Sequence, residues 1–251
     1  MKKNVIMFIL LMLSLVAFSQ NDDLTISAGR PGMATGPDVM PFRKVQMETG
    51  FEISRSYTTS VLLPTVMLRY GITQFAELRV EYDGNYNLRP DKSWSYEIDP
   101  LVVGTKAKIY EGENWIPKIS MMANLSIPMV RQDSTVRVAP LLYLLFQNDI
   151  TEWFNVGYNI GAEWSGVTHV PSTFLALCLG FNVCDSFGAF IESYNTFTRN
   201  GMKETDVECN LDFGVTYLVH PKVQLDLYGM FNCQNPKSFN GMGLGMAWLL
   251  N

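Results

Sequence analysis

The chain is poor in histidine, cysteine and charged residues. Among its 251 residues there are two His and four Cys, and only 17% of residues are charged. The four cysteines match no metal-ligand spacing with the two distant histidines, so the sequence predicts neither a metal site nor a cofactor. These cysteines are Cys178, Cys184, Cys209 and Cys233. Their spacing does not indicate a disulfide, although one is allowed outside the cytoplasm.

The charge balance argues against nucleic acid as a partner. The formal net charge is -5 and the pI is near 5.1, whereas duplex binding needs a basic face that displaces counterions. Disorder is also excluded, because 47% hydrophobic and 12% aromatic residues supply apolar surface that offsets the entropy of ordering. With a mean hydropathy of +0.06, soluble all-β, soluble mixed and outer-membrane β classes remain.

The first residues have the order of a secretory signal peptide. Lys2 and Lys3 precede an apolar run over 5–18, and Ala17 and Ser19 are the small residues of a cleavage site. This run is shorter than the ~20 residues of a membrane span, and no later apolar stretch is long enough either. We therefore expect residues 1–19 to be removed, which changes the net charge from -5 to -7 because two lysines are lost.

The rest of the chain shows an alternation of apolar and polar residues. Between Val45 and Ile53 the apolar residues are separated by Gln46, Glu48, Gly50 and Glu52, which is typical of a strand with one dry and one wet face. About twelve such segments occur, near 44–55, 60–70, 76–86, 97–110, 117–130, 136–148, 153–164, 172–183, 186–198, 205–218, 222–232 and 240–250. Their length matches the ~9 to 11 residues that a tilted strand needs to cross a bilayer. A soluble periplasmic sandwich is the rival fold, since its strands alternate too.

The connections between these segments alternate in kind. Short connections follow Tyr70, Asn148, Val183 and Val219, and longer polar ones lie around 56–59, 87–96, 131–135, 165–171, 199–204 and 233–239. Short periplasmic turns with longer outer loops are typical of outer-membrane barrels. We predict an all-β, antiparallel up-and-down transmembrane β-barrel of about 12 strands over 44–251. Its location would be the outer membrane of a Gram-negative bacterium, with outer-membrane lipid and the outer-membrane assembly machinery as partners.

Residues 20–43 belong to no predicted strand. Six Gly and Pro residues make this segment a turn-rich coil that cannot form a ladder: Gly29, Pro31, Gly32, Gly36, Pro37 and Pro41. Two interpretations stay open. The segment is either a periplasmic lead-in to the first strand or a partial plug in the barrel mouth, with Arg30 paired to a lumen carboxylate.

Charged side chains on the wet faces are the candidates for lining the lumen. They are Glu48, Glu52, Arg69, Glu77, Arg79, Glu81, Lys106, Lys108, Lys118, Arg137, Glu163, Glu192, Asp206, Glu208, Asp212 and Asp226. Basic members gather on strands two to six and acidic members on strands nine to eleven, which predicts a transverse field that orients dipolar solutes. The alternative, which we favour, is that neighbouring strands pair their charges and leave a small channel. Twelve strands lie between filled eight-stranded barrels and open porins, so a narrow path is expected.

The sequence does not predict an enzyme. His169 lies near Ser165 and Ser172 in one predicted outer loop, and some twelve-stranded outer-membrane phospholipases use Ser and His at the outer rim. A triad, however, is recognised by its geometry and needs a third orienting group. His220 precedes Pro221 in a predicted periplasmic turn, where no substrate path leads. A lipid-modifying enzyme is therefore the last of the alternatives considered.

The N-terminal motif resembles that of a known family. Residues 30–37 read Arg-Pro-Gly-Met-Ala-Thr-Gly-Pro and are followed by Gln46 and Glu48 in the first predicted strand. This combination is similar to the opening signature of the outer-membrane transporter family named for the meta pathway of phenol degradation (phenol MetA degradation-like). The motif positions are Arg30, Pro31, Gly32, Thr35, Gly36, Pro37, Gln46 and Glu48. The resemblance covers essentially the whole mature chain.

Membership of this family implies an outer-membrane β-barrel. It also implies passive diffusion of small, aromatic or amphipathic solutes through the lumen, while the identity of the solute stays open. A structural or adhesive barrel without transport is the alternative function.

Overall fold

The computed structural model describes residues 26–55, 59–88, 92–129, 136–199, 204–234 and 239–250. The expected signal peptide, residues 1–19, lies outside these ranges. Within them, no helix is long and apolar enough to cross a membrane.

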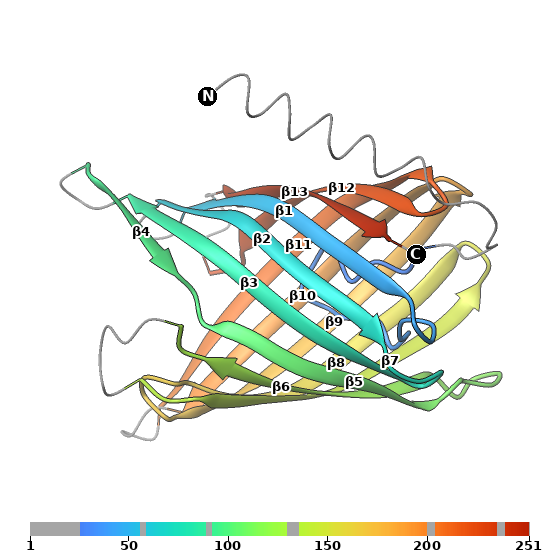
Figure 1. Cartoon of the computed structure of the whole chain (residues 1–251), viewed down its shortest axis with the longest axis horizontal. Coiled ribbons are helices and arrows are strands. Elements are labelled where there is room, and N and C mark those ends of the chain that lie inside the picture. Colours follow the sequence, from blue (N-terminus) through green and yellow to red (C-terminus); the bar gives the residue numbers. More distant parts are fainter. Residues whose placement is uncertain are drawn as a thin grey trace.

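The described residues form an all-β structure in which every span predicted from the alternation overlaps a strand (Figure 1). The strands are β1 (Val45–Arg55), β2 (Thr59–Gly71), β3 (Ala76–Leu88), β4 (Trp94–Ile98), β5 (Leu101–Tyr110), β6 (Lys118–Ile127), β7 (Ala139–Thr151), β8 (Phe154–Trp164), β9 (Pro171–Cys184), β10 (Phe187–Arg199), β11 (Thr205–His220), β12 (Val223–Asn232) and β13 (Phe239–Leu249).

The strands close into an antiparallel barrel. Each strand from β5 to β13 pairs with its neighbour in the sequence, and β1 pairs with β13 through a register that places Thr49 opposite Met246. Closure leaves no unpaired edge along the seam, which is the condition for a sheet to sit in lipid. The predicted up-and-down barrel of about 12 strands is confirmed.

One span is broken into two strands. Both β4 and β5 pair with β3, β4 along Gly84–Leu88 and β5 along Ala76–Glu81, so together they occupy a single position in the barrel. The break falls at Asp99 and Pro100, where proline has no N–H to donate to the ladder. The single strand predicted over 97–110 is therefore divided, and its outer part forms a hairpin with the end of β3 (Figure 1).

The two faces of the barrel wall have opposite character. On β3, the side chains of Glu77 and Arg79 are buried, whereas Leu78 and Val80, which alternate with them, are exposed, Leu78 by 46%. The same arrangement recurs on β11, where Asp212 is buried and its neighbours Leu211 and Phe213 are exposed. A sandwich would bury the apolar face. Apolar side chains outside and polar side chains inside indicate a barrel whose outer surface meets lipid.

The connections sort to the two ends of the barrel. Short turns over 72–75, 152–153, 185–186 and 221–222 lie at the end where β1 begins and β13 finishes. The connection over 111–117 between β5 and β6 is longer and also lies at this end. The connections predicted to be longer lie at the opposite end, which we call the loop end. The predicted short turns and the predicted longer loops thus lie at opposite ends of the barrel, and the connection over 111–117 is the exception in length.

A charge on the outer face should destabilise the barrel in lipid. Leu177 lies at the middle of β9, is 50% exposed, and faces Tyr158 and Ser193 on the neighbouring strands. We expect Leu177→Arg to cost roughly 2–4 kcal/mol of folding free energy, because the guanidinium would be placed near the bilayer midplane. Urea titration of the protein in lipid vesicles measures this. Leu177→Ala is the matched control, and an equal loss in both variants would contradict a lipid-facing position.

Candidate functional site

An irregular stretch before β1 runs through the interior of the barrel (Figure 1). We call residues 26–41 the internal segment. At one end, Ile26 N donates to the Pro221 carbonyl in the β11–β12 turn at 2.8 Å. Just after the other end, Phe42 forms a β-bridge with Gly71, the last residue of β2. The side chains of Ile26, Val39 and Met40 are buried. The segment therefore lies across the end of the barrel that carries the short turns.

One wall of the barrel holds the internal segment by its backbone. The Glu192 carboxylate on β10 accepts hydrogen bonds from Met33 N at 2.7 Å and Ala34 N at 3.0 Å. The Asn159 side chain on β8 accepts from Thr35 N at 2.7 Å and donates to the Thr35 carbonyl at 3.0 Å. These contacts fix the middle of the segment against β8 and β10.

Glycine is required where this turn approaches the wall. Gly32 has a φ of +99°, and a Cβ atom built on it would lie 2.8 Å from Glu192 Oε2. Residues that carry a Cβ atom rarely adopt this backbone conformation. The clash would also push the Glu192 carboxylate away from the N–H groups that donate hydrogen bonds to it. The glycine at position 32 of the N-terminal motif thus has a structural cause.

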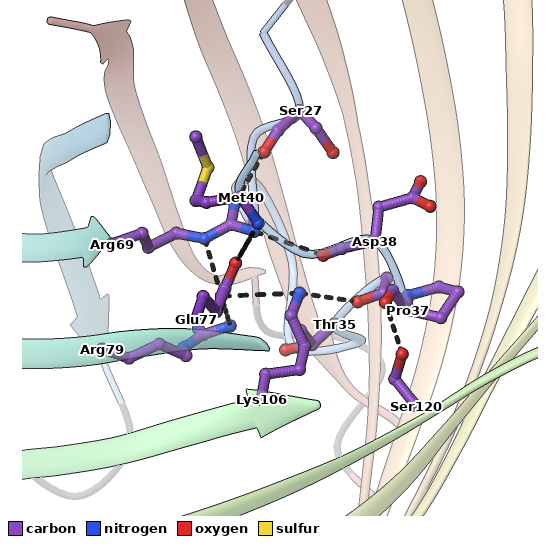
Figure 2. Close-up of polar contacts among 12 residues, drawn as sticks. Ser27, Thr35, Pro37, Asp38, Met40, Arg69, Glu77, Arg79, Lys106 and Ser120 are labelled. Atoms are coloured by element: carbon purple, nitrogen blue, oxygen red, sulfur yellow. Dashed lines mark hydrogen bonds and ion pairs between the residues drawn. The ribbon is translucent and has the colours of Figure 1, made fainter. Parts of the chain in front are cut away.

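The opposite wall also binds the backbone of the internal segment (Figure 2). Lys106 Nζ on β5 donates to the Gly36 carbonyl at 3.0 Å, and Ser120 Oγ on β6 donates to the Pro37 carbonyl at 2.5 Å. On β3, Glu77 Oε2 accepts from Met40 N at 2.6 Å. Walls on both sides of the lumen therefore hold one continuous segment.

A buried cluster of charges on β1, β2, β3 and β5 supports these contacts, and Figure 2 shows its members Arg69, Glu77, Arg79 and Lys106. Glu77 lies 2.9 Å from Arg69, 3.5 Å from Arg79 and 3.7 Å from Lys106. Arg69 also contacts Glu48 at 3.1 Å. Cross-strand pairing of this kind neutralises charge inside the barrel. We call Glu48, Arg69, Glu77, Arg79 and Lys106 the charge cluster.

Arg69 joins the charge cluster to the internal segment. Its guanidinium donates to the Ser27 carbonyl at 2.6 Å and to the Asp38 carbonyl at 3.3 Å (Figure 2). A guanidinium offers five donors in a fixed fork, which allows it to bind two carboxylates and two carbonyls at once. Both ends of the segment are therefore tied to one side chain of β2.

Arg30 extends from the internal segment toward β12. Its Nε lies 3.6 Å from Asp226 Oδ2, and its guanidinium lies 5.8 Å from the centre of the Tyr228 ring. Burial alone would lower the pKa of the Arg30 guanidinium, but attraction to Asp226 and Tyr228 holds the pKa above its ordinary value. Arg30 is thus a charged side chain inside the barrel, 17% exposed.

A cavity of about 550 Å³ lies inside the barrel beside the internal segment. Gly29, Arg30, Gly32, Met33 and Thr35 of the segment form part of its wall. Among the described lining residues are three tyrosines and seven charged side chains: Tyr143, Tyr194, Tyr228, Arg30, Glu48, Glu52, Arg79, Glu81, Asp83 and Glu163. Five of the charged groups are carboxylates and two are guanidinium groups, so the lining is acidic on balance.

Two of these tyrosines hold carboxylates in place. Tyr143 donates its hydroxyl hydrogen to Glu163 at 2.7 Å, and Tyr228 donates to Glu52 at 2.7 Å. The first pair joins the neighbouring strands β7 and β8, and the second joins β12 to β1 across the intervening β13. The cavity thus presents aromatic faces next to ordered carboxylate oxygens, a combination suited to a small polar or amphipathic solute.

Most of the sequence-predicted lumen residues lie inside the barrel. Eight are buried there: Glu48, Arg69, Glu77, Arg79, Lys106, Glu192, Asp212 and Asp226. Glu52, Glu81 and Glu163 line the cavity. Lys108 and Lys118 lie near the short turns, where they pair with Glu111 at 3.0 Å and with Asp149 at 2.9 Å respectively.

The structure places three predicted lumen residues at the loop end instead. Arg137 is exposed and precedes β7, and its N–H bonds the Gly166 carbonyl. Asp206 and Glu208 are exposed on a part of β11 that extends beyond its pairing with β12, which begins at Asn210. Both residues have the parity of the inner face of β11. Their position along the barrel axis, however, places them beyond the enclosed lumen.

Sequence reasoning missed several interior residues. Asn159 and Ser120 share the parity of charged wet-face residues, so the alternation could have indicated them. Tyr143 lies in the apolar run of β7, where no alternation is visible. Asp83 lines the cavity although it was not among the predicted residues.

The loop that contains His169 is ordered by its own hydrogen bonds. Ser165 Oγ accepts from Val167 N at 3.2 Å and from Thr168 N at 3.1 Å, while Ser172 Oγ donates to the Glu163 carbonyl at 3.4 Å. His169 has a φ of 58°. These contacts give both serines a structural role in the turn.

Comparison with known proteins points to one family and one fold. The sequence pattern of the family described as "Putative MetA-pathway of phenol degradation" matches residues 28–248. The NanC porin is similar in structure, with a TM-score of 0.54 and 12% identity over 81% of this chain and 98% of that one. The KdgM porin has a TM-score of 0.52 and 7% identity over 80% and 98%. No curated protein sequence matches the chain.

Proposed function

The chain belongs to this family, as its N-terminal motif predicted, and from that premise we propose that it is an outer-membrane channel for small solutes. The observation that carries the proposal is a cavity of about 550 Å³, lined in part by charged side chains, inside a closed barrel whose outer face is apolar. Such a wall separates lipid from a water-compatible path. The shared fold of two porins supports the same interpretation.

The proposed location is the outer membrane of a Gram-negative bacterium. The signal-like first residues and the lipid-compatible outer face support it, and insertion would involve outer-membrane lipid and the outer-membrane assembly machinery. No nucleic acid and no cofactor belong to this proposal.

The path through the proposed channel is narrow. The internal segment crosses the lumen and binds both walls, from Glu192 on one side to Lys106 on the other. We propose that the segment acts as a plug that restricts passive diffusion to small solutes. The tyrosines around the cavity favour aromatic or amphipathic molecules over purely aliphatic ones.

Reconstitution tests the proposed function. The purified protein, shown to be folded by heat-modifiable gel migration, should produce stepwise conductance in planar bilayers and should let small solutes swell liposomes, with rates that fall as solute size rises. A folded barrel that gives neither conductance nor swelling would overturn the channel and favour the structural or adhesive alternative.

The acidic lining should make the channel prefer cations. Glu81 and Asp83 lie on β3 and line the cavity, where their charge raises the local concentration of cations. We expect a positive cation selectivity under a salt gradient, and we expect the double variant Glu81→Gln/Asp83→Asn to lower the cation-to-anion permeability ratio about twofold or more. The reversal potential measures this ratio.

The exposed Glu97 of β4 provides the matched control. Glu97→Gln removes one carboxylate charge at the loop end without touching the cavity, so the reversal potential should change little. Equal shifts in the two variants would show that the selectivity arises from the surface of the barrel rather than from its interior.

A further inference from the structure

Two cysteines face each other at the loop end of the β11–β12 hairpin. The register of these strands places Asn210 opposite Asn232. One step further out, Cys233 N donates to the Cys209 carbonyl at 2.8 Å. The antiparallel ladder therefore continues to Cys209 and Cys233, which lie directly opposite each other.

This position suits a disulfide. Directly opposed residues of a hydrogen-bonded antiparallel pair have Cα atoms ~5.5 Å apart, and disulfides join Cα atoms that are roughly 4.4 to 6.8 Å apart. The two side chains also contact each other. Burial and a hydrogen bond with the Cys209 thiol raise the pKa of the Cys233 thiol to about 11. In the structure both cysteines are thiols.

The other two cysteines have different neighbours. Cys178 on β9 lies opposite Gly157 and Glu192, and Cys184 lies opposite Phe187. Neither register position offers a second sulfur. The chain thus has one pair of cysteines in opposed positions, Cys209 and Cys233. The other two, Cys178 and Cys184, serve as controls because they have no opposed cysteine.

We propose that Cys209 and Cys233 form a disulfide that staples the outer end of the β11–β12 hairpin. This inference rests on the proposed location, because disulfides persist outside the cytoplasm. The bond would join β11 and β12 at the point where their pairing ends. Opening of the hairpin from the loop end would then require a covalent bond to break.

The oxidant in this proposal is a periplasmic thiol–disulfide oxidoreductase in its disulfide form. The thiolate of one cysteine attacks a sulfur of the oxidoreductase, which forms a mixed disulfide and releases the first oxidoreductase thiolate. The second cysteine thiolate then attacks the sulfur of its partner, forming the Cys209–Cys233 bond and expelling the second oxidoreductase thiolate. The oxidoreductase leaves as a dithiol with the two electrons and the two protons that the cysteines gave up.

Peptide mapping of the full chain tests the disulfide. The protein is purified from membranes without reductant, denatured in iodoacetamide and digested with trypsin, which separates Cys209 (peptide 204–222) from Cys233 (peptide 223–237). We expect these peptides to be linked, and only Cys178 and Cys184 to be alkylated. Reduction before alkylation should raise the number of alkylated cysteines from two to four.

Variants make the result specific. Cys209→Ser should free Cys233 for alkylation, whereas Cys178→Ser should leave the linked peptides unchanged. Four alkylated cysteines in unreduced protein that still shows heat-modifiable migration would overturn the disulfide. The outcome is separate from that of the bilayer conductance, so the loss of one proposal is distinguishable from the loss of the other.

Discussion

Deletion of residues 27–39 is expected to raise the single-channel conductance by roughly an order of magnitude, because it removes the internal segment from a lumen of twelve strands. The segment binds β10 through Glu192 and β5 through Lys106, so it occupies the width of the path. Planar-bilayer recordings of the deletion variant and the full chain at equal salt measure the change.

A milder variant separates plugging from collapse of the barrel. Glu192→Ala removes the carboxylate that accepts the N–H groups of Met33 and Ala34, and hydrogen bonds to a charged acceptor are among the stronger ones. We expect brief openings above the basal conductance level. The deletion variant must retain heat-modifiable migration, and a folded deletion variant with unchanged conductance would refute the plug.

Glu77→Gln should be the most destabilising of the conservative substitutions inside the barrel. The change leaves Arg69, Arg79 and Lys106 around a neutral group, although all three side chains are at most 10% exposed. Removal of one partner from a buried ion pair costs about 3–5 kcal/mol. Urea unfolding in lipid vesicles measures the loss, and the temperature of the heat-modifiable transition should fall with it.

Two further variants test the cause of this loss. Lys106→Met added to Glu77→Gln removes one uncompensated cation and should recover part of the stability. Glu163→Gln is the control, because the amide oxygen can still accept the Tyr143 hydrogen bond. If Glu77→Gln and Glu163→Gln unfolded alike, the charge cluster would have no special role in stability.

The fold could be predicted because successive residues of a barrel strand face the interior and the exterior in turn, which gives the sequence an alternation of polar and apolar residues. Glu77 and Arg79 alternate with Leu78 and Val80 in the sequence, and the same residues alternate between interior and exterior. The break at Asp99 and Pro100 could not be located from this alternation, since the pattern runs on both sides of it. Proline was the available signal.

The candidate site could be predicted only in part. The composition of the internal segment and the candidate pairing of Arg30 were visible in the sequence, but the contacts of Met33 and Ala34 were not. These residues use backbone N–H groups, which leave no trace in residue type, and Glu192 lies 159 and 158 positions away. The position of a residue along the barrel axis could not be predicted either. The alternation shows that Glu208 has the parity of the inner face, but it does not show that Glu208 lies at the loop end.

The seam between β1 and β13 also has a consequence for the order in which contacts form. The bond between Arg69 and Glu77 spans 8 positions of one hairpin, so it can form early, at low loop-closure entropy. The Thr49–Met246 pairing needs the last strand of the chain. The internal segment binds Glu77 on β3 and Lys106 on β5, which both precede the last strand, so these contacts can form before the final seam closes.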